Sequence, residues 1–274
     1  MGKINAKEIN ARIIEQALNL GASVAGIANV DALKNSPSHF VFGKLDRFKE
    51  AGTTDSGNIA PGQVAWPDNF GSAVVVGVEH PEDKPELDWW QDGLRGGTLG
   101  NRILMDINIR LSDWLEKEKG YKTKKLPYHI ENGGIFLKDA AVMAGLGCIG
   151  RNNLVVTPDY GPRVRLRAIL LDAELPASGA IRFNPCNDCD MPCRTVCPQA
   201  AFQKKIYRND ELGLDELPGR NGVYSRSLCN DQMRNDIYNS EKFNVIDHNR
   251  PGEPIKYCRK CESACPVGKN DSKQ

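Results

Sequence analysis

The sequence has no long apolar run, no export signal and almost no net charge. No stretch approaches the ~20 consecutive apolar residues of a transmembrane helix, and no secretory or twin-arginine signal stands at its beginning. With 36 Lys and Arg against 35 Asp and Glu, the net charge is +1. Such a balance gives no overall attraction to nucleic acid or to an anionic membrane. We therefore expect a soluble, cytoplasmic protein without a membrane contact.

Cysteine, in contrast, is plentiful, and eight of the nine cysteines lie in the C-terminal third. They form the run CNDCDMPCRTVCP at 186–198, a lone Cys229 and a second run, CRKCESACP, at 258–266. Close-spaced runs that end in Cys-Pro hold cubane iron–sulfur clusters, and the last cysteine of such a run binds the neighbouring cluster. Eight cysteines thus predict two 4Fe–4S clusters with no ligand left over.

The spacing also predicts which cysteines share a cluster. The first cluster is expected to be bound by Cys186, Cys189, Cys193 and Cys265. The second is expected to be bound by Cys197, Cys229, Cys258 and Cys261. The gap before Cys193 is one residue longer than in bacterial ferredoxins. We expect this residue to bulge the loop and to change the hydrogen bonds to the sulfurs, which influence the reduction potential.

Zinc and disulfides are the competing explanations for these cysteines. Zinc sites usually combine two separated CxxC pairs, whereas residues 186–197 hold four cysteines and are followed by Pro198. Disulfides are disfavoured because reduced thiols are the default in the cytosol. Iron–sulfur clusters remain the interpretation that fits both the number and the spacing.

The apolar pattern before the cysteines predicts an α+β domain over residues 1–178, followed by a cysteine-rich domain over 179–274. Helices are expected at Ala6–Leu20, from Ile103 to near Gly120, and at Ile135–Leu146. Strands are expected at Ala22–Ala28, Ala73–Val78, Val155–Val156 and Val164–Leu171. The stretch 29–69 is predicted to be a long irregular connection with one short helix near Lys44–Glu50, and 202–228 a polar insertion.

Three features of this first part raise the question of a binding site. Gly145–Gly150 matches GxGxxG, but a helix is expected before it and no helix after it, so we reject a dinucleotide site. Trp89 and Trp90 are expected either to stack on a cofactor or to pack a loop onto the core. Arg163, Arg165 and Arg167 alternate with apolar residues, which places three guanidinium groups on one strand face. That row is expected to bind an anionic group or to face solvent.

The stretch GLGCIGRNNLVVTPDYGPRVRLRAILLDAELP at 145–176, followed by the eight-cysteine order, resembles the epoxyqueuosine reductase family and the related part of reductive dehalogenases. The resemblance implies a cobalamin-binding domain similar to the nitroreductase fold, followed by a two-cluster ferredoxin-like domain. It implies that the clusters pass single electrons to cobalamin, which then performs reductive chemistry on a small molecule or on a corrinoid protein. A ferredoxin or flavodoxin type of protein is the expected low-potential electron donor.

The resemblance also suggests roles for particular residues. The proton-donating acid of the family falls on Glu131, with Tyr128 and His129 as alternative donors or as ordinary surface or core residues. The residues expected to line the cofactor are Gly145, Gly147, Cys148, Gly150, Tyr160, Arg163 and Arg165. Cys148 replaces a tryptophan of the family and is expected to be a small buried residue or, as the alternative, a thiol facing cobalt.

Two alternative functions follow from the differences between this chain and the family. The chain ends shortly after its last cysteine, without the helical repeats with which epoxyqueuosine reductases grip tRNA, so we expect a tRNA substrate to be unlikely. A cobalamin-free electron-transfer protein that docks on a partner enzyme is the first alternative to a cobalamin-dependent reductase. Epoxyqueuosine reductase activity on tRNA is the second.

Overall fold

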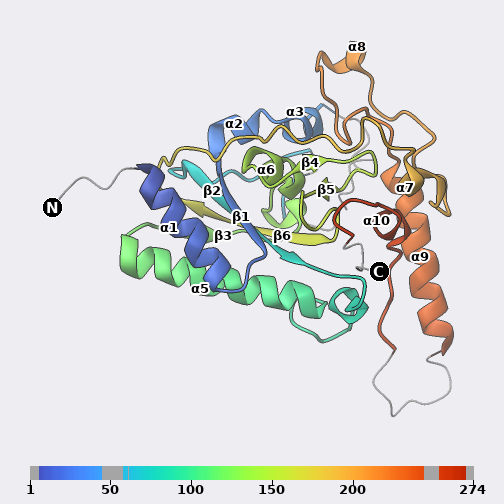
Figure 1. Cartoon of the computed structure of the whole chain (residues 1–274), viewed down its shortest axis with the longest axis horizontal. Coiled ribbons are helices and arrows are strands. Elements are labelled where there is room, and N and C mark those ends of the chain that lie inside the picture. The colour runs from blue at the N-terminus through green and yellow to red at the C-terminus, as the bar shows by residue number, and fades with distance from the viewer. Residues whose placement is uncertain (1–5, 45–57, 61, 244–252, 270–274) are drawn as a thin grey trace.

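The computed structural model describes residues 6–44, 58–60, 62–243 and 253–269. Residues 6–175, here called the sheet region, hold the sheet and most of the longer helices, and 186–269 form the cysteine segment (Figure 1). The helices and 3₁₀ turns of the sheet region are α1 (Ala6–Asn19), α2 (Val30–Lys34), α3 (Pro37–Phe42), η1 (Pro85–Asp88), α5 (Leu99–Lys119), η2 (Ile130–Asn132) and α6 (Leu137–Met143). Those of the cysteine segment are α7 (Pro192–Thr195), α8 (Asn209–Leu212), α9 (Arg226–Phe243) and α10 (Lys260–Ser263).

The central sheet is antiparallel, with strand order β1-β2-β6-β3. Its strands are β1 (Val24–Asn29), β2 (Ser72–Glu79), β3 (Thr123–Lys125) and β6 (Val164–Leu171). In register, Asn29 of β1 lies opposite Ser72 of β2, and Ser72 lies opposite Leu171 of β6. A separate hairpin pairs β4 (Cys148–Ile149) with β5 (Val155–Val156). The α+β class is thereby confirmed.

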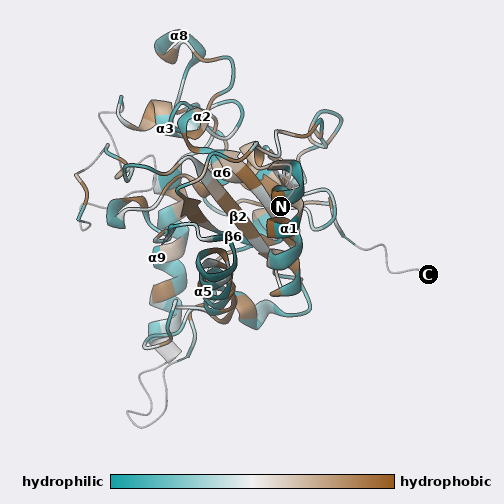
Figure 2. Cartoon of the chain, turned by 90° about the vertical axis from the view of Figure 1, so that its left-hand side faces the viewer, coloured by the Kyte–Doolittle hydropathy of each residue, from teal (hydrophilic) through white to brown (hydrophobic). Residues whose placement is uncertain are grey.

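Helices cover both faces of the sheet. Val74 and Val76 of β2 pack with α1 and α5, through residues such as Ile13 and Leu111, whereas Val75 packs on the side of α6. Because both faces are covered, β2 is buried from Ser72 to Val78 and reads as a continuous apolar run. Figure 2 shows the brown strands β2 and β6 between helices whose outer surfaces are teal. Within the described residues, no helix is long and apolar enough to span a membrane.

Most of the predicted elements of the sheet region form close to their expected bounds. α5 begins after Thr98, whose hydroxyl accepts from the Asn101 N–H, and ends at Gly120, which has φ +69°. α6 is shorter than expected, because residues 144–147 turn into the β4–β5 hairpin. The stretch 29–69 is less irregular than predicted, since it contains α2 and α3. The helix expected near Lys44–Glu50 lies, apart from Lys44, outside the described residues.

A buried polar cluster fixes the corner between α2 and α3 against α6. The Asp139 carboxylate accepts hydrogen bonds from the Ser36 hydroxyl, the Ser38 N–H and the Ser38 hydroxyl, at 2.6 to 2.8 Å. His39 Nε2 accepts from the Phe136 N–H at 3.1 Å, so its proton sits on Nδ1, which faces the Ser36 hydroxyl at 2.9 Å. Burial lowers the pKa of His39 to about 4, against the opposing charge of Asp139.

We predict that this cluster makes the fold sensitive to acid between pH 6.5 and pH 4. The unfolded chain protonates His39 near 6.5, whereas the folded chain resists protonation down to about 4, so stability is present above 6.5 and falls as the pH drops through this window. At ~1.4 kcal/mol per pH unit, the loss has an upper limit of ~3 kcal/mol. Urea unfolding of wild type and His39→Gln at pH 7 and pH 4.5 measures it. Equal pH dependence in the two proteins would contradict the prediction.

Candidate redox site

The cysteine segment brings its thiols together in two groups of four. Cys193 interacts electrostatically with Cys186, Cys189 and Cys265, and all four line one small hollow together with Arg151 and Pro266. Cys261 interacts with Cys197, Cys229 and Cys258. These are the two sets that the spacing predicts, although iron binding by them stays a prediction. Cys229 comes from α9, Cys261 from α10 and Cys193 from α7.

The surroundings of the first group fit an anionic cluster. Burial, reinforced by the neighbouring thiols, raises the pKa of Cys193 to about 11, so thiolates here require added positive charge. Arg194 and Arg163 supply part of it beside Cys193 and Cys265. The Nε of Arg151 and the Nη1 of Arg220 are buried and have no hydrogen-bond partner. Such unsatisfied donors suit the sulfides of an iron–sulfur cluster.

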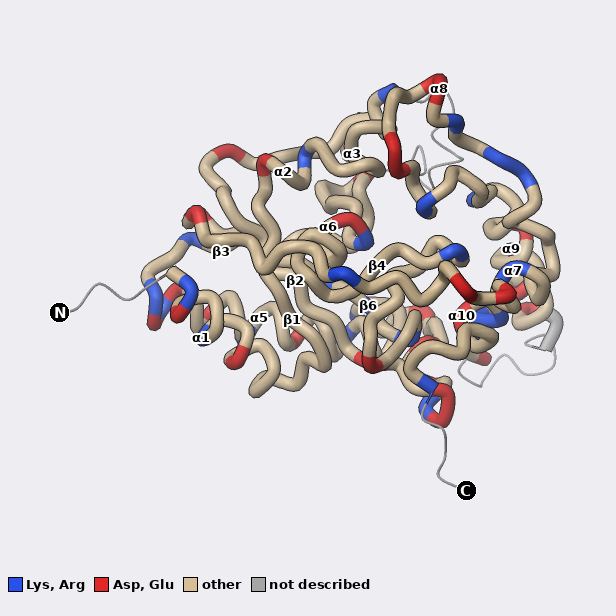
Figure 3. Tube along the Cα trace, turned by 45° about the horizontal axis from the view of Figure 1, so that its top comes forward, with Lys and Arg blue, Asp and Glu red and all other residues tan. Residues whose placement is uncertain are grey.

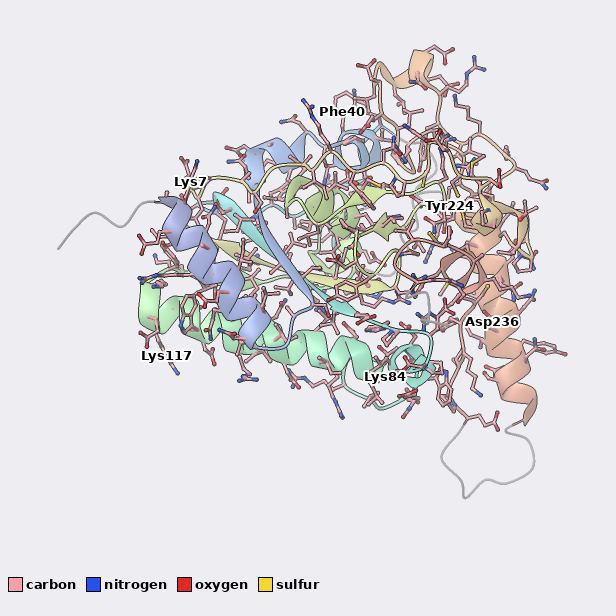
Figure 4. All side chains as sticks on the ribbon, viewed as in Figure 1. Lys7, Phe40, Lys84, Lys117, Tyr224 and Asp236 are labelled. Carbon is pink, nitrogen blue, oxygen red and sulfur yellow. The ribbon has the colours of Figure 1, made fainter. Side chains whose placement is uncertain are left out.

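The second group of cysteines has different residues around it. Burial and the adjacent thiols raise the pKa of Cys261 to about 12. The Tyr224 hydroxyl is hydrogen-bonded to both Cys229 and Arg226, and Figure 4 labels Tyr224 above α9. Arg226 Nε is another buried donor without a partner. In the described ranges, no three His, Cys, Asp or Glu side chains converge closely enough to hold a metal ion as they stand. The donors and charges fit two clusters.

Arg163 and Arg165 connect the sheet to the cysteine segment. The Arg163 side chain is only 5% exposed, and its guanidinium donates to the carbonyls of Cys265 and Val267. Arg165 binds Asp88 at 2.8 Å through Nε and Glu262 at 2.9 Å through Nη2. Both guanidinium groups therefore have partners within the protein rather than facing solvent alone, and binding of an anionic cofactor group by them stays a prediction.

Asp88 is the centre of this connection. Its carboxylate pairs with Arg165 of β6, with Arg259 of the cysteine segment at 2.7 Å and with His80 Nδ1 at 2.8 Å. Although burial raises the pKa of Asp88, the hydrogen bond from His80 and the two arginines lower it below its ordinary value. Glu262, 5% exposed, pairs with the same two arginines. This ion-pair network (Asp88, Arg165, Arg259 and Glu262) joins three distant parts of the chain.

The glycine-rich turn at 145–150 serves packing in this structure. Gly145 has φ +75°, and a side chain on Gly147 would lie 2.1 Å from the Val156 carbonyl oxygen, so the β4–β5 hairpin closes only with glycine there. A helix precedes the turn and a hairpin follows it, which agrees with the rejection of a dinucleotide site. Cys148 interacts with Cys186 and Cys265, and burial raises its pKa to about 11. It is thus a protonated, half-buried thiol beside the first group.

The three candidate proton donors follow one another between β3 and α6. Glu131, in η2, is 11% exposed at its side chain, and its Oε1 lies 3.8 Å from Nδ1 of His129, which is 62% exposed. Tyr128 is 48% exposed, and its ring centroid lies 5.9 Å from the Arg167 guanidinium. Tyr128 also interacts electrostatically with Arg226 beside Cys229. Among the three candidate donors, Tyr128 is thus the one with a recorded interaction near the second group.

Other residues singled out in the sequence have different surroundings. Trp90 exchanges backbone hydrogen bonds with Ile255 at 3.0 and 2.8 Å, and Trp89 lines a hollow with Pro85, Lys256 and Tyr257. The tryptophans thus contact the cysteine segment. Tyr160 lies in the turn after β5, where its N–H donates to the Thr157 hydroxyl at 3.2 Å. No pattern in the sequence predicted the network around Asp88, because its members are far apart in the chain.

Comparison with known proteins bears out the resemblance. No family model matches the chain. An epoxyqueuosine reductase from Bacillus anthracis is 23% identical over 204 residues, which cover 72% of this chain and 48% of that protein. A tetrachloroethene reductive dehalogenase from Desulfitobacterium hafniense is 23% identical over 245 residues, covering 79% and 43%. The chain spans about half the length of the curated relatives it matches.

Solved structures of the same two kinds of enzyme are similar to this chain. A crystal structure of epoxyqueuosine reductase with an epoxyqueuosine-modified tRNA stem loop aligns with a TM-score of 0.58 at 18% identity, covering 98% of this chain and 68% of that one. A reductive dehalogenase, studied for B12-dependent dehalogenation, aligns with a TM-score of 0.53 at 19% identity, covering 94% and 31%. The chain has the fold of epoxyqueuosine reductases and reductive dehalogenases.

We predict that Cys193→Ser removes about half of the bound iron, because it deletes a ligand of the first group only. Cys148→Ser is the matched control, since Cys148 lies beside the same group and belongs to neither set of four. Iron analysis and EPR of the anaerobically reduced proteins measure the result. Equal iron in Cys193→Ser and wild type, or equal losses in the two variants, would contradict the assignment.

We also predict that Asp88→Asn destabilises the protein by ~3 kcal/mol, because Arg165 and Arg259 lose their shared buried counter-charge. Asp210→Asn is the control: it removes a carboxylate from an exposed ion pair with Arg208 and is expected to leave the stability nearly unchanged. Thermal unfolding of the iron-loaded proteins under anaerobic conditions gives the comparison. A similar loss in both variants would show that burial of the network contributes nothing.

Proposed function

We propose that the protein is an iron–sulfur oxidoreductase that passes electrons from two 4Fe–4S clusters to a bound cobalamin for reductive chemistry on a small molecule or a corrinoid. The observation that supports it most is the grouping of eight cysteines into two sets of four, with Arg194 and Arg163 beside the first set and Arg226 near Cys229 of the second. The relatives named above are reductases, which favours the same class of reaction. The finer division into a nitroreductase-like domain at 1–178 and a ferredoxin-like domain at 179–274 belongs to this proposal.

In this proposal the two sets of thiolates hold the clusters, which supply single electrons at low potential. The buried arginine donors stabilise the clusters' negative charge and hold the loops around them. Tyr224 and Arg226 connect Cys229 to the side on which Tyr128 lies.

Glu131 and His129 suit proton delivery. His129 is exposed and lies 3.8 Å from Glu131, whose side chain is largely buried, so a proton taken from solvent by His129 has a short route to Glu131. The Ile59 N–H donates to the Glu131 carbonyl at 2.9 Å and holds this turn in place. Glu131 is the proposed acid, His129 its supply, and Tyr128 the alternative donor.

Cobalamin enters the proposal through the resemblance, since one neighbouring structure concerns B12-dependent dehalogenation. When bound, it would supply a reduced cobalt centre to the substrate. The two hollows described above, beside Trp89 and between the first four cysteines, do not include Glu131. The expected cofactor-lining residues Gly145, Gly147 and Gly150 remain assigned by resemblance.

Activity on tRNA is the second candidate function. An epoxyqueuosine reductase of this fold has been crystallised with a tRNA stem loop, which speaks against our expectation that tRNA is an unlikely substrate. A cobalamin-free electron carrier is the third candidate.

The experiment that tests the proposal is anaerobic metal analysis, with absorption and EPR spectra before and after adding cob(II)alamin and a low-potential reductant. We expect about eight irons per chain, one retained corrinoid and loss of the Co(II) signal on reduction. Eight irons without corrinoid would favour the electron carrier. Zinc in place of iron would exclude both the cobalamin-dependent reductase and the electron carrier.

We predict that Glu131→Gln lowers turnover at least ~100-fold, the usual contribution of a general acid, while iron content and spectra stay as in wild type. Glu118→Gln, at an exposed position near the end of α5, is the control. The assays use an epoxyqueuosine-modified tRNA stem loop and 3-bromo-4-hydroxybenzoic acid, the ligands of two neighbouring structures. Full activity of Glu131→Gln would remove Glu131 from proton delivery.

A further inference from the structure

The second cysteine group reaches the protein surface at one point. Of the nine cysteines, Cys258 is the exposed one, whereas Cys193 and Cys265 of the first group are buried. Cys258 lies two residues before the start of α10, and its N–H donates to the Asp236 carboxylate of α9 at 2.8 Å. Figure 1 shows α9 and α10 next to each other at the edge of the molecule away from α1. An electron coming from outside has its shortest protein path to the second group here.

Two lysines flank Cys258. Lys256 and Lys260 are exposed, and in the described part of the chain neither side chain has an ion-pair partner. Lys256 Nζ lies 4.6 Å from the centroid of a Trp89 ring, which keeps the ammonium group beside the hollow. Next to Cys258, these are the cations free to meet a carboxylate of another protein.

The carboxylates near the lysines are already engaged. Asp88 is held by Arg165, Arg259 and His80, and Glu82 lies 3.4 Å from Lys269 and 3.7 Å from Arg163. Asp236 accepts from the Cys258 N–H and from the Gln232 side chain. Figure 3 shows basic and acidic residues close together around α7 and α10. The donors to Asp236 are neutral, so its charge remains, but the two lysines outnumber it and the net charge beside Cys258 is positive.

A hollow adjoins the lysines. It is lined by Glu82, Pro85, Asp88, Trp89, Lys256, Tyr257, Arg259 and Ser263. Its apolar members, Pro85 and the rings of Trp89 and Tyr257, offer a small contact surface within a charged rim. Weak electron-transfer complexes have small interfaces of this kind, steered by charge.

We propose that Trp89, Lys256, Tyr257, Cys258 and Lys260 form the electron-entry patch, the docking surface for a small acidic protein with a low-potential one-electron centre near its surface. One electron passes from the donor's reduced centre to the second cluster, so the donor is oxidised, the cluster is reduced, and no bond is made or broken. This inference rests on the proposed function, because it requires the second cluster.

The test is stopped-flow reduction of the iron-loaded protein by an acidic plant-type ferredoxin at low ionic strength. We expect Lys256→Glu/Lys260→Glu to slow reduction at least ~10-fold and to weaken its dependence on salt, because charge reversal removes the attraction that steers the donor. Reduced methyl viologen, a small cation, is the second reductant, and its rate is expected not to fall. That result would show that the cluster itself remains reducible.

Lys117→Glu/Lys119→Glu is the matched control. Lys119 lies 5.1 Å from a Trp114 ring, much as Lys256 lies beside Trp89, and Figure 4 shows Lys117 at the end of α5 far from Asp236. This variant carries the same change in charge and is expected to keep the wild-type rate. An unchanged rate in Lys256→Glu/Lys260→Glu, or an equal fall in both variants, overturns the patch. Absence of reducible cluster absorbance in wild type would instead overturn the proposed function.

Discussion

The pairing of Asp88 with Arg165 and Arg259 is the interaction on which the rest of the arrangement depends. It places β6, the turn after β2 and the loop before α10 in contact with one buried carboxylate. Arg163, two residues before Arg165 in the chain, donates hydrogen bonds to the carbonyl oxygens of Cys265 and Val267. Arg163, directly before β6, and Arg165, within it, both direct their guanidinium groups to the cysteine segment. The ion pairs and hydrogen bonds of these arginines therefore set the position of the cysteine groups relative to the sheet.

The electrostatics of the cysteines complement this framework. Burial raises the pKa of the thiols, and four thiolates in one place repel one another. Arginines around the first group and the Tyr224–Arg226 pair beside Cys229 reduce that cost, and in the proposed function iron would supply the remaining positive charge. Folding of the cysteine segment and loading of the clusters are thus expected to be coupled, while the sheet region has an apolar core of its own.

The sequence predicted the sheet region well, because its signals are local. The apolar runs of β2 and β6 and the amphipathic period of α5 are each readable within one segment. Helices α2 and α3 were missed since they are too short to show a period, although Asn29 as a cap and Pro37 at a first turn were usable signals. Helix α9 was missed because its sequence is polar. The partners of Arg165 lie 77 and 97 residues away, beyond any local pattern.

The shared use of Asp88 and Glu262 has an evolutionary consequence. Both acids contact both arginines, so a change at any one of positions 88, 165, 259 and 262 leaves a buried charge short of its counter-charge. Among related chains these positions are expected to vary together rather than singly. A recombination that exchanged the cysteine segment alone would separate Arg165 from Glu262. We therefore expect strand β6 and the cysteine segment to be inherited together, even though more than 80 residues of sequence lie between Arg165 and α10.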